Sequence, residues 1–301
     1  MKTENYDLFV NKITDPKRTM SDYFGVAPFS ILNTVDGDWQ KRKKRWNVLI
    51  NDKATTRGKA ELGLSALGLG GVSLLDAVLA ELMIKWFTEE NYKTFDPFAG
   101  DTVFGFVSAF LKRPFEGIEL REEQAIFNQL QCDINGLPAK YICDSSENMD
   151  KYIENESKDF IFSCPPYADL EVYSDLEDDL STMSHEDFFK MYSKILQNTY
   201  KKLKNDRFAV VVTSEVRNKK GEYIQLVGKT IDLMVKAGYM FYNDIILINS
   251  VGTLPMRAGR YMNSSRKVGR RHQNVLVFYK GDPKKIKENF SELIPKNEHY
   301  D

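Results

Sequence analysis

The sequence is poor in cysteine and contains no long uncharged hydrophobic run. Its three cysteines, Cys132, Cys143 and Cys164, are odd in number and widely spaced. This argues against a disulfide framework and against a zinc site, so we expect no metal, and reduced thiols as in a cytoplasmic protein. No apolar run reaches the length of a membrane span, and the start, MKTENYDLFVNK, lacks the apolar core of a secretory signal. We therefore expect no membrane contact.

A charge excess of either sign is also missing. The 301 residues carry a formal net charge of −1 at pH 7. Hydrophobic residues make up 42% and charged residues 28%, and the length is typical of one large α/β domain with additions. Because no global charge attracts a polyanion, any contact with nucleic acid must come from a local basic patch.

Short apolar runs alternate with amphipathic stretches through most of the chain. This alternation predicts an α/β fold with a mostly parallel sheet and helices on both faces. The last two runs lack a helix-length amphipathic segment between them, so we expect an antiparallel last strand. The seven predicted strands are residues 93–98, 115–120, 140–144, 159–163, 207–213, 242–250 and 273–280.

Two helices are predicted ahead of this alternation. The segment 38–50, DWQKRKKRWNVLI, places two tryptophans on one helical face. Its basic residues are either solvated on a surface helix that the tryptophans anchor, or in contact with nucleic acid. The segment 73–87 has apolar residues at helical spacing, with Ser73 as the expected N-cap and Asp76 three residues later.

Acidic residues and a glycine follow the predicted strands. The stretch FDPFAGDTVFG, residues 95–105, places Asp96 at the end of the first strand and Gly100 in the next turn. Glu119 ends the second strand and Asp144 the third. In open α/β sheets ligands bind at these strand ends, where Glu119 could bind a ribose and Asp144 an amino group. Each acid could equally be a solvated residue or a helix cap.

The fourth strand ends in the tetrapeptide Cys164-Pro165-Pro166-Tyr167. Adjacent prolines cannot donate hydrogen bonds to a β-ladder, and they fix two φ angles. The strand must therefore stop there and continue as a stiff, extended backbone.

Four features thus follow the predicted strands in order: the DPFAG loop, Glu119, Asp144 and the tetrapeptide. In this order they resemble the S-adenosylmethionine-dependent DNA amino-methyltransferases. The hallmark of that family is a DPF-x-G loop followed by a (Asp/Asn/Ser)-Pro-Pro-(Tyr/Phe/Trp) tetrapeptide, and the resemblance covers residues 73–280. It implies a Rossmann-like class I methyltransferase fold and methylation of N4 of cytosine or N6 of adenine in DNA. The segments LEVYSD, VGTLPMRAGR and HQNVLVFYKGD are most similar to solitary enzymes of phages and prophages.

The resemblance also implies roles for individual residues in binding S-adenosylmethionine. Asp96, Phe98 and Gly100 would hold the methionine end, Glu119 the ribose and Asp144 the adenine, with Phe162 or its neighbours beside the cofactor.

The tetrapeptide would supply the catalytic groups. An exocyclic amino nitrogen is a poor nucleophile because its lone pair is delocalised into the ring. The resemblance implies that the carbonyl of Pro165, stiffened by Pro166, accepts a hydrogen bond from that nitrogen, with the side chain of residue 164 as a second acceptor. Tyr167 would stack on a base flipped out of the duplex, and the methyl group would be transferred directly.

The sequence departs from the family pattern at two positions. Cys164 stands where Asp, Asn or Ser is usual, and a thiol is a weak acceptor. Its shape, close to that of Ser, slightly favours cytosine, and thiol attack on carbon-5 of cytosine is a less favoured alternative. Thr102 stands where Gly is frequent, which predicts a tighter or differently shaped turn. Both departures favour a rival interpretation, an inactive DNA-binding relic.

The segment between the last two strands, residues 251–272, contains no acidic residue. Basic residues mixed with Ser, Asn, Gly and Tyr suit contact with DNA phosphates, and a solvated flexible loop is the alternative. Because the chain has no room for a large recognition domain, we expect short or relaxed sequence specificity. The predicted DNA-contacting residues are Arg257, Arg260, Arg266, Lys267, Arg270 and Arg271.

We divide the chain into an N-terminal extension (1–60), a catalytic domain (61–283) and a C-terminal tail (284–301). We expect a monomer or homodimer in a bacterial or phage-infected cell, where protection from restriction and regulation both fit a lone methyltransferase. Two rival substrates stay open. One is RNA, whose single-stranded bases need no flipping, and the other is a protein glutamine, which enzymes of the same fold methylate with Asn-Pro-Pro-Tyr.

Overall fold

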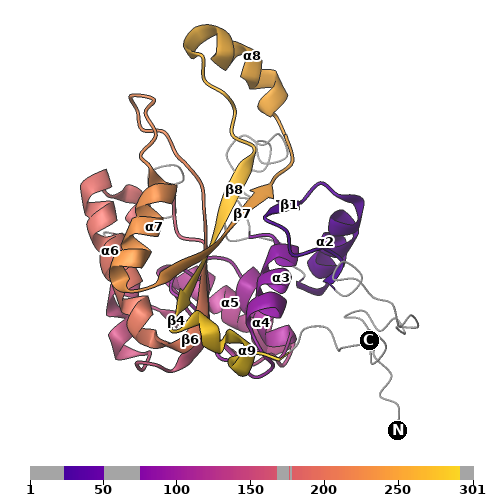
Figure 1. Ribbon diagram of the computed structural model, residues 1–301, viewed down its shortest axis with the longest axis vertical. Helices are drawn as coiled ribbons and strands as arrows, with labels where there is room; N and C mark the ends of the chain where they lie inside the picture. Colours follow the sequence, from indigo (N-terminus) through magenta and orange to yellow (C-terminus); the bar gives the residue numbers. More distant parts are fainter. Residues whose placement is uncertain (1–23, 51–74, 168–175, 177, 292–301) are drawn as a thin grey trace.

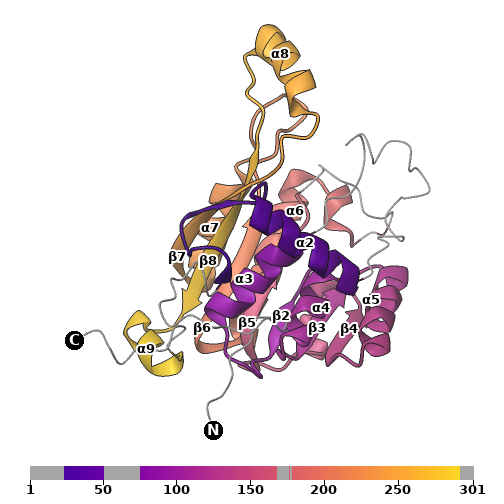
Figure 2. The same ribbon diagram turned by 90° about the vertical axis from the view of Figure 1, so that its right-hand side faces the viewer.

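The computed structural model describes residues 24–50, 75–167, 176 and 178–291. Within these residues the chain forms one eight-stranded sheet with helices on both faces (Figures 1 and 2). None of the helices in this part of the chain is long and apolar enough to cross a membrane.

The sheet has the strand order β1-β7-β8-β6-β5-β2-β3-β4. All pairings are parallel except those of β8, which runs antiparallel to β6 and β7. The predicted fold is confirmed, but the count of seven strands was one short, because the very short β1 joins the edge beside β7. The strands are β1 Ile31–Asn33, β2 Thr94–Asp96, β3 Phe115–Glu119, β4 Ala139–Cys143, β5 Lys158–Ser163, β6 Leu203–Thr213, β7 Met240–Ile248 and β8 His272–Lys280.

Helices cover the two faces of the sheet. The α-helices are α2 Gly37–Ile50, α3 Ala77–Phe87, α4 Val103–Phe110, α5 Glu122–Ile134, α6 His185–Lys202, α7 Leu226–Ala237, α8 Leu254–Ser265 and α9 Ile286–Asn289, and the short 3-10 helices are η3 Ser146–Lys151, η5 Leu180–Thr182 and η6 Pro283–Lys285. The helices α2, α3 and α4 share one hydrophobic cluster with the sheet, and α6 and α7 share another with its opposite face.

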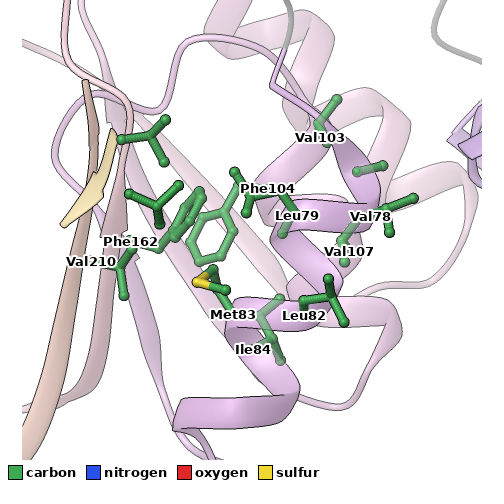
Figure 3. Close-up of a cluster of buried hydrophobic side chains, with 14 of the residues drawn as sticks. Val78, Leu79, Leu82, Met83, Ile84, Val103, Phe104, Val107, Phe162 and Val210 are labelled. Atoms are coloured by element: carbon green, nitrogen blue, oxygen red, sulfur yellow. The ribbon is translucent and has the colours of Figure 1, made fainter. Parts of the chain in front are cut away.

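Strand β5 shows how the sequence builds these two layers. Phe160 and Phe162 belong to the cluster beneath α3 and α4, whereas Ile161 belongs to the cluster beneath α6 and α7. Figure 3 shows Phe162 against Phe104 of α4, and their ring centroids are 4.6 Å apart. Successive side chains of a strand point to opposite faces, so a strand that is covered on both sides is apolar throughout.

The basic helix α2 is held on α3 by a buried carboxylate. Arg42 donates from Nε and Nη2 to the two oxygens of Glu81, at 2.7 and 2.5 Å. Trp46 donates to the same carboxylate at 2.8 Å, and Lys85 lies 2.8 Å from it. The tryptophans therefore anchor the helix, and Arg42 stabilises the fold.

The N-terminal extension shares the sheet and the hydrophobic core with the rest of the described chain. The predicted boundary at 60/61 lies outside the described residues.

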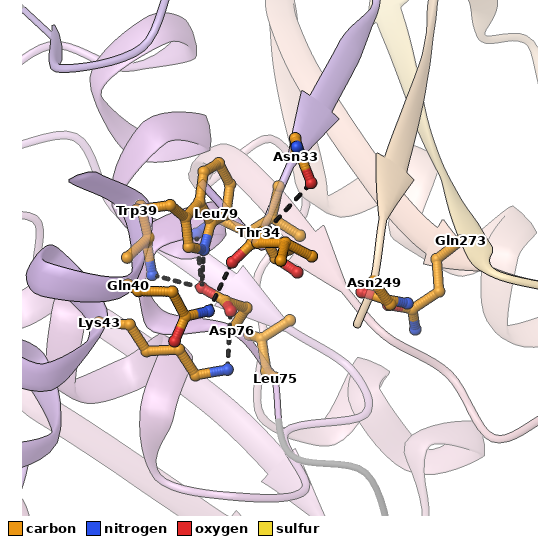
Figure 4. Close-up of polar contacts among 12 residues, drawn as sticks. Asn33, Thr34, Trp39, Gln40, Lys43, Leu75, Asp76, Leu79, Asn249 and Gln273 are labelled. Carbon is orange, nitrogen blue, oxygen red and sulfur yellow. Dashed lines mark hydrogen bonds and ion pairs between the residues drawn. The ribbon is translucent and has the colours of Figure 1, made fainter. Parts of the chain in front are cut away.

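Asp76 makes a second link between the same two helices. It is the N-cap of α3, and its Oδ1 accepts from the backbone N–H of Val78 at 2.9 Å. Trp39 Nε1 donates to Oδ1 at 3.2 Å, and Lys43 Nζ lies 2.9 Å from Oδ2 (Figure 4). The prediction of Ser73 as the cap was wrong because α3 begins later, and Ser73 itself lies outside the described residues.

The segment between β7 and β8 projects from the body as an arm, which we define as residues 251–271 (Figures 1 and 2). The predicted loop at this position in fact contains the helix α8, with a proline in its first turn. No residue of α8 is buried. The arm therefore contributes no hydrophobic core from this helix and offers its side chains to solvent.

We predict that Arg42→Ala lowers the free energy of unfolding by about 3 kcal/mol, because it leaves the fully buried carboxylate of Glu81 without its bidentate partner. Burial by itself raises the pKa of Glu81, but Arg42 and Lys85 hold that pKa below its usual range. The stabilisation is therefore present near neutral pH and is lost as the pH falls through the lowered pKa.

Urea unfolding at pH 7 measures this loss. The matched control is Lys44→Ala, which removes an exposed charge from the same helix and should change the stability by less than about 0.5 kcal/mol. Equal losses in the two variants would contradict a stabilising role for the Arg42 contact.

Candidate active site

A cavity opens at the carboxyl edge of the sheet, where β2, β3, β4 and β5 end. It brings together Asp96, Phe98, Gly100, Glu119 and the tetrapeptide, which come from separate parts of the sequence. The lining residues are Leu75, Asp96, Pro97, Phe98, Ala99, Gly100, Asp101, Ile118, Glu119, Leu120, Arg121, Ser145, Ser146, Cys164, Pro165, Pro166, Tyr167, Asp178, Asp179, Leu180, Met191 and Ile195.

Asp96 lies at the centre of this arrangement. Its Oδ1 accepts from the backbone N–H of Phe98 at 2.8 Å, which shapes the loop after β2. The same oxygen accepts from the hydroxyl of Ser163 at 2.6 Å, so it also contacts the end of β5, next to Cys164. Burial raises the pKa of Asp96 to about 7, and the charges of Asp101 and Glu119 act in the same direction.

The loop after Asp96 is held from behind by α5. Gly100 has φ of 54°, in the left-handed region that favours glycine. Its carbonyl accepts from Asn128 Nδ2 at 3.0 Å. Thr102 donates from Oγ1 to Asn128 Oδ1 at 2.7 Å, with its own φ at −70°. The backbone therefore does not require glycine at 102, and the turn differs from the family pattern by gaining this hydrogen bond.

The ribose candidate Glu119 is held by a neighbour. Its Oε1 accepts from the backbone N–H of Arg121 at 3.1 Å and from Arg121 Nε at 3.2 Å. Arg121 Nη2 donates to Gln124 at 3.1 Å, and Gln124 donates to Asn128 Oδ1 at 2.7 Å. A continuous polar network thus joins Glu119 to the loop at Gly100. Gln124 and Asn128 could not be recognised as site residues from the sequence, since amides inside an amphipathic helix carry no signal of a site.

Asp144, predicted to bind the adenine, is not among the cavity-lining residues. Its Oδ1 accepts from the backbone N–H of Ser145 at 2.7 Å, and its Oδ2 accepts from the hydroxyl of Tyr152 at 2.6 Å. The hydrogen bond from Tyr152 is the main cause that holds the pKa of Asp144 below its usual range. Ser145 and Ser146 line the cavity at this strand end instead.

Phe162 was also predicted to lie beside the cofactor, and the structure places it elsewhere. Its side chain points into the core beneath α3 and α4, where it packs against Phe104 (Figure 3). The alternation along β5 is the physical reason, because Ser163, which contacts Asp96, must face the other way.

The tetrapeptide lines the cavity beside Asp96. Tyr167 is mostly buried, and its hydroxyl lies 3.5 Å from Cys164 Sγ. Gln273 of β8 donates to this hydroxyl from Nε2 at 2.7 Å. Asn249 in turn donates to Gln273 Oε1 at 3.2 Å, and Figure 4 shows these two side chains next to each other. The position of Tyr167 therefore depends on a residue 106 positions away, and no motif in the sequence marks that residue.

The predicted DNA-contacting residues of the arm differ in their surroundings. Arg260, Arg266 and Arg271 are exposed, although Arg271 Nε also donates to the carbonyl of Asn249 at 3.0 Å. Arg270 instead donates to Ser214 Oγ at 2.9 Å and to the side chain of Asn274 in β8. Its guanidinium is therefore hydrogen-bonded within the protein. Arg257 and Lys267 are half-buried.

The cysteines and the other metal-binding side chains of the described residues form no metal site. Among the described residues there is no group of three or more His, Cys, Asp or Glu side chains that could hold a metal ion. Cys143 is exposed and Cys132 is buried, where desolvation raises the pKa of its thiol to about 12.

Comparison with known families gives a match to the C-terminal part of the chain. Residues 158–301 match the family model N6_N4_Mtase, described as DNA methylase, and this part includes the tetrapeptide and the arm. No curated protein matches the chain.

Solved structures that match the chain do so at low sequence identity. TrmN from Thermus thermophilus is 14% identical over 68% of this chain, with a TM-score of 0.47, and the match spans only 49% of TrmN. A TehB-like methyltransferase from Corynebacterium glutamicum is 13% identical over 77% of this chain and 98% of its own, with a TM-score of 0.44. Precorrin-6y C5,15-methyltransferase from Geobacter metallireducens is 12% identical over 69% of this chain and 90% of its own, with a TM-score of 0.45.

We predict that Asp96→Asn changes the pH dependence of stability. A carboxyl group with a pKa of about 7 in the fold and a lower pKa when unfolded destabilises the fold as the pH rises between these values. Asn keeps an oxygen that accepts from Phe98 and Ser163 but cannot ionise. At about 1.4 kcal/mol per pKa unit, the variant should gain at most about 4 kcal/mol relative to the wild type between pH 4 and pH 8.

Urea unfolding of both proteins across this pH range measures the relative gain. A stability difference between the two proteins that stays constant with pH would contradict the raised pKa of Asp96.

Proposed function

We propose that this chain is an S-adenosylmethionine-dependent DNA amino-methyltransferase of the N4-cytosine/N6-adenine type, as the match to the DNA methylase family supports. We further propose that its cavity receives a base flipped out of the duplex. One observation carries the proposal. Asp96 and Tyr167 line the same cavity, and the bond from Ser163 to Asp96 brings the loop after β2 to the start of the tetrapeptide.

The residues of the cavity fit S-adenosylmethionine at the loop after β2 and the end of β3. We propose that Asp96, Phe98 and Gly100 bind its methionine end and that Glu119 binds its ribose hydroxyls. The network from Arg121 to Asn128 supports this assignment because it holds both parts in one fixed geometry. When bound, the cofactor supplies an electrophilic methyl group. We assign Ser145, a cavity-lining residue, to its adenine end in preference to Asp144.

On the substrate side, the tetrapeptide makes the amino nitrogen a better nucleophile. The carbonyl of Pro165 accepts a hydrogen bond from the exocyclic N–H, which favours a pyramidal nitrogen with an available lone pair. Cys164 Sγ is a weaker second acceptor. Tyr167 stacks on the base and holds it in line with the methyl donor, so that proximity and orientation lower the barrier. The Ser-like shape of Cys164 favours cytosine as the base.

The arm contacts the phosphates of the duplex in this proposal. The support is that it leaves the sheet at the same ends of the strands as the cavity-lining loops, that it has exposed arginines and that it lacks acidic residues. Arg260, Arg266 and Arg271 are the residues best placed for this role. Arg270 instead holds the base of the arm against Ser214.

The finer biological setting also belongs to this proposal. The segments that resemble solitary phage and prophage enzymes favour a chain that protects DNA from restriction or marks it for regulation. The predicted division at residues 60/61 and 283/284, the cytoplasmic location and the monomeric or dimeric state remain predictions.

Nucleoside mass spectrometry on DNA from cells that express the protein tests the proposed function. We expect N4-methylcytosine or N6-methyladenine in DNA from the wild type, and a lower level of the same base in cells that express Tyr167→Ala at equal level. If purified wild-type protein binds S-adenosylmethionine but no methylated base is found, the proposal fails. RNA and protein glutamine are then the substrates to examine.

We predict that Tyr167→Ala lowers kcat by about 10- to 100-fold, because stacking contributes about 1–3 kcal/mol. The affinity for S-adenosylmethionine should stay within about twofold, since the ring lies on the substrate side. Tyr167→Phe keeps the ring and removes only the hydroxyl bonded to Gln273, so its kcat should fall less. Single-turnover kinetics and calorimetry measure the two quantities. Equal losses of turnover and cofactor affinity in the Ala variant would refute the stacking role.

A further inference from the structure

A second basic element rises beside the arm and was not identified from the sequence. It is the segment between β6 and α7, residues 214–225, which we call the 214–225 hairpin. Arg217 and Tyr223 form an antiparallel bridge, and the backbone N–H of Gly221 donates to Asn218 O at 2.8 Å. The guanidinium of Arg217 lies 3.8 Å from the centre of the Tyr223 ring. These contacts give the hairpin a defined shape.

The hairpin lies against the arm. At its base Ser214 accepts from Arg270 of the arm at 2.9 Å. Near its tip, a Cβ atom added to Gly221 would lie 2.5 Å from Lys267 Nζ, so the side chain of this lysine lies directly on the turn. Because β6 and β7 are parallel, the hairpin and the arm leave the sheet at the same edge, the one at which the cavity opens (Figures 1 and 2).

Lys219 and Lys220 occupy the tip of the hairpin and are both exposed. In the described part of the chain neither lysine has a carboxylate partner. The two acids of the hairpin have contacts elsewhere. Glu215 accepts from the backbone N–H of Val227 at 3.2 Å, and Glu222 accepts from Asn218 at 3.0 Å. The tip is therefore positively charged and continues the basic surface that begins at Lys267.

We propose that the 214–225 hairpin is a second contact for the phosphate backbone of duplex DNA, with Lys219 and Lys220 as the residues that neutralise phosphates. This inference rests on the proposed function and extends it. Two elements that rise from one sheet edge can contact the duplex at two places around a flipped base. Such paired contacts fix the position of the duplex over the cavity without reading its sequence.

The test measures binding of the full chain to a fluorescent DNA duplex as a function of salt. Each phosphate contact contributes about 0.9 to the slope of log K against log salt. Lys219→Ala with Lys220→Ala should therefore reduce the slope by about 1.8 and weaken binding most at low salt. The matched control removes the same charge at the opposite edge of the sheet, with Lys140→Ala and Lys236→Ala. Both control lysines are exposed, and we expect no change in slope. Affinity for S-adenosylmethionine reports that each variant is folded.

The outcomes separate this inference from the proposed function. An unchanged slope in the hairpin variant, with wild-type protein that still methylates DNA, overturns the hairpin contact and leaves the function intact. An equal reduction in the control variant also overturns it, because net charge would then explain the effect. Loss of binding to single-stranded RNA but not to duplex DNA would overturn the assignment of the partner. Absence of any DNA methylation by the wild type would instead reject the proposed function.

Discussion

The hydrogen bond between the hydroxyl of Ser163 and the carboxylate of Asp96 joins two halves of the site that are 67 residues apart in the chain. The same oxygen of Asp96 accepts from Phe98, so one buried atom positions both the loop after β2 and the end of β5. Pairing of β2 with β5 brings the two strand ends together, and the hydrogen bond sets their final geometry. Burial raises the pKa of Asp96, and the hydrogen bond from Ser163 offsets this rise only in part.

Polar contacts from outside the motifs then hold each half. At the loop after β2, Asn128 binds the carbonyl of Gly100, and the network through Gln124 extends to Glu119. At the tetrapeptide, Gln273 donates to the hydroxyl of Tyr167. Amides suit this role because they donate and accept at once, and an unsatisfied buried amide would be costly. Residues of α5 and β8, which lie outside the motifs, thus fix the geometry of the cavity.

The two basic segments of the chain serve different purposes. Helix α2 is rich in lysine and arginine, yet Arg42 pairs with the buried Glu81 and Lys43 with Asp76, so part of its charge stabilises the contact with α3. The arm has no acidic residue and no buried residue in α8, so most of its charge faces solvent. Composition alone does not distinguish the basic helix α2 from the arm. The two differ in whether a neighbouring element places acids against their basic residues.

The sheet and much of the cavity could be predicted from the sequence, because their signals lie in short local segments. Alternating apolar runs predicted the mainly parallel sheet, and the strand-end motifs predicted the cavity that contains Asp96, Glu119 and the tetrapeptide. Strand β1, the orientation of Phe162 and the contacts of Asn128 and Gln273 could not be predicted in this way. Each depends on which face of an element is covered, or on a partner far away in the chain. Such pairings exist only once packing has brought the elements together.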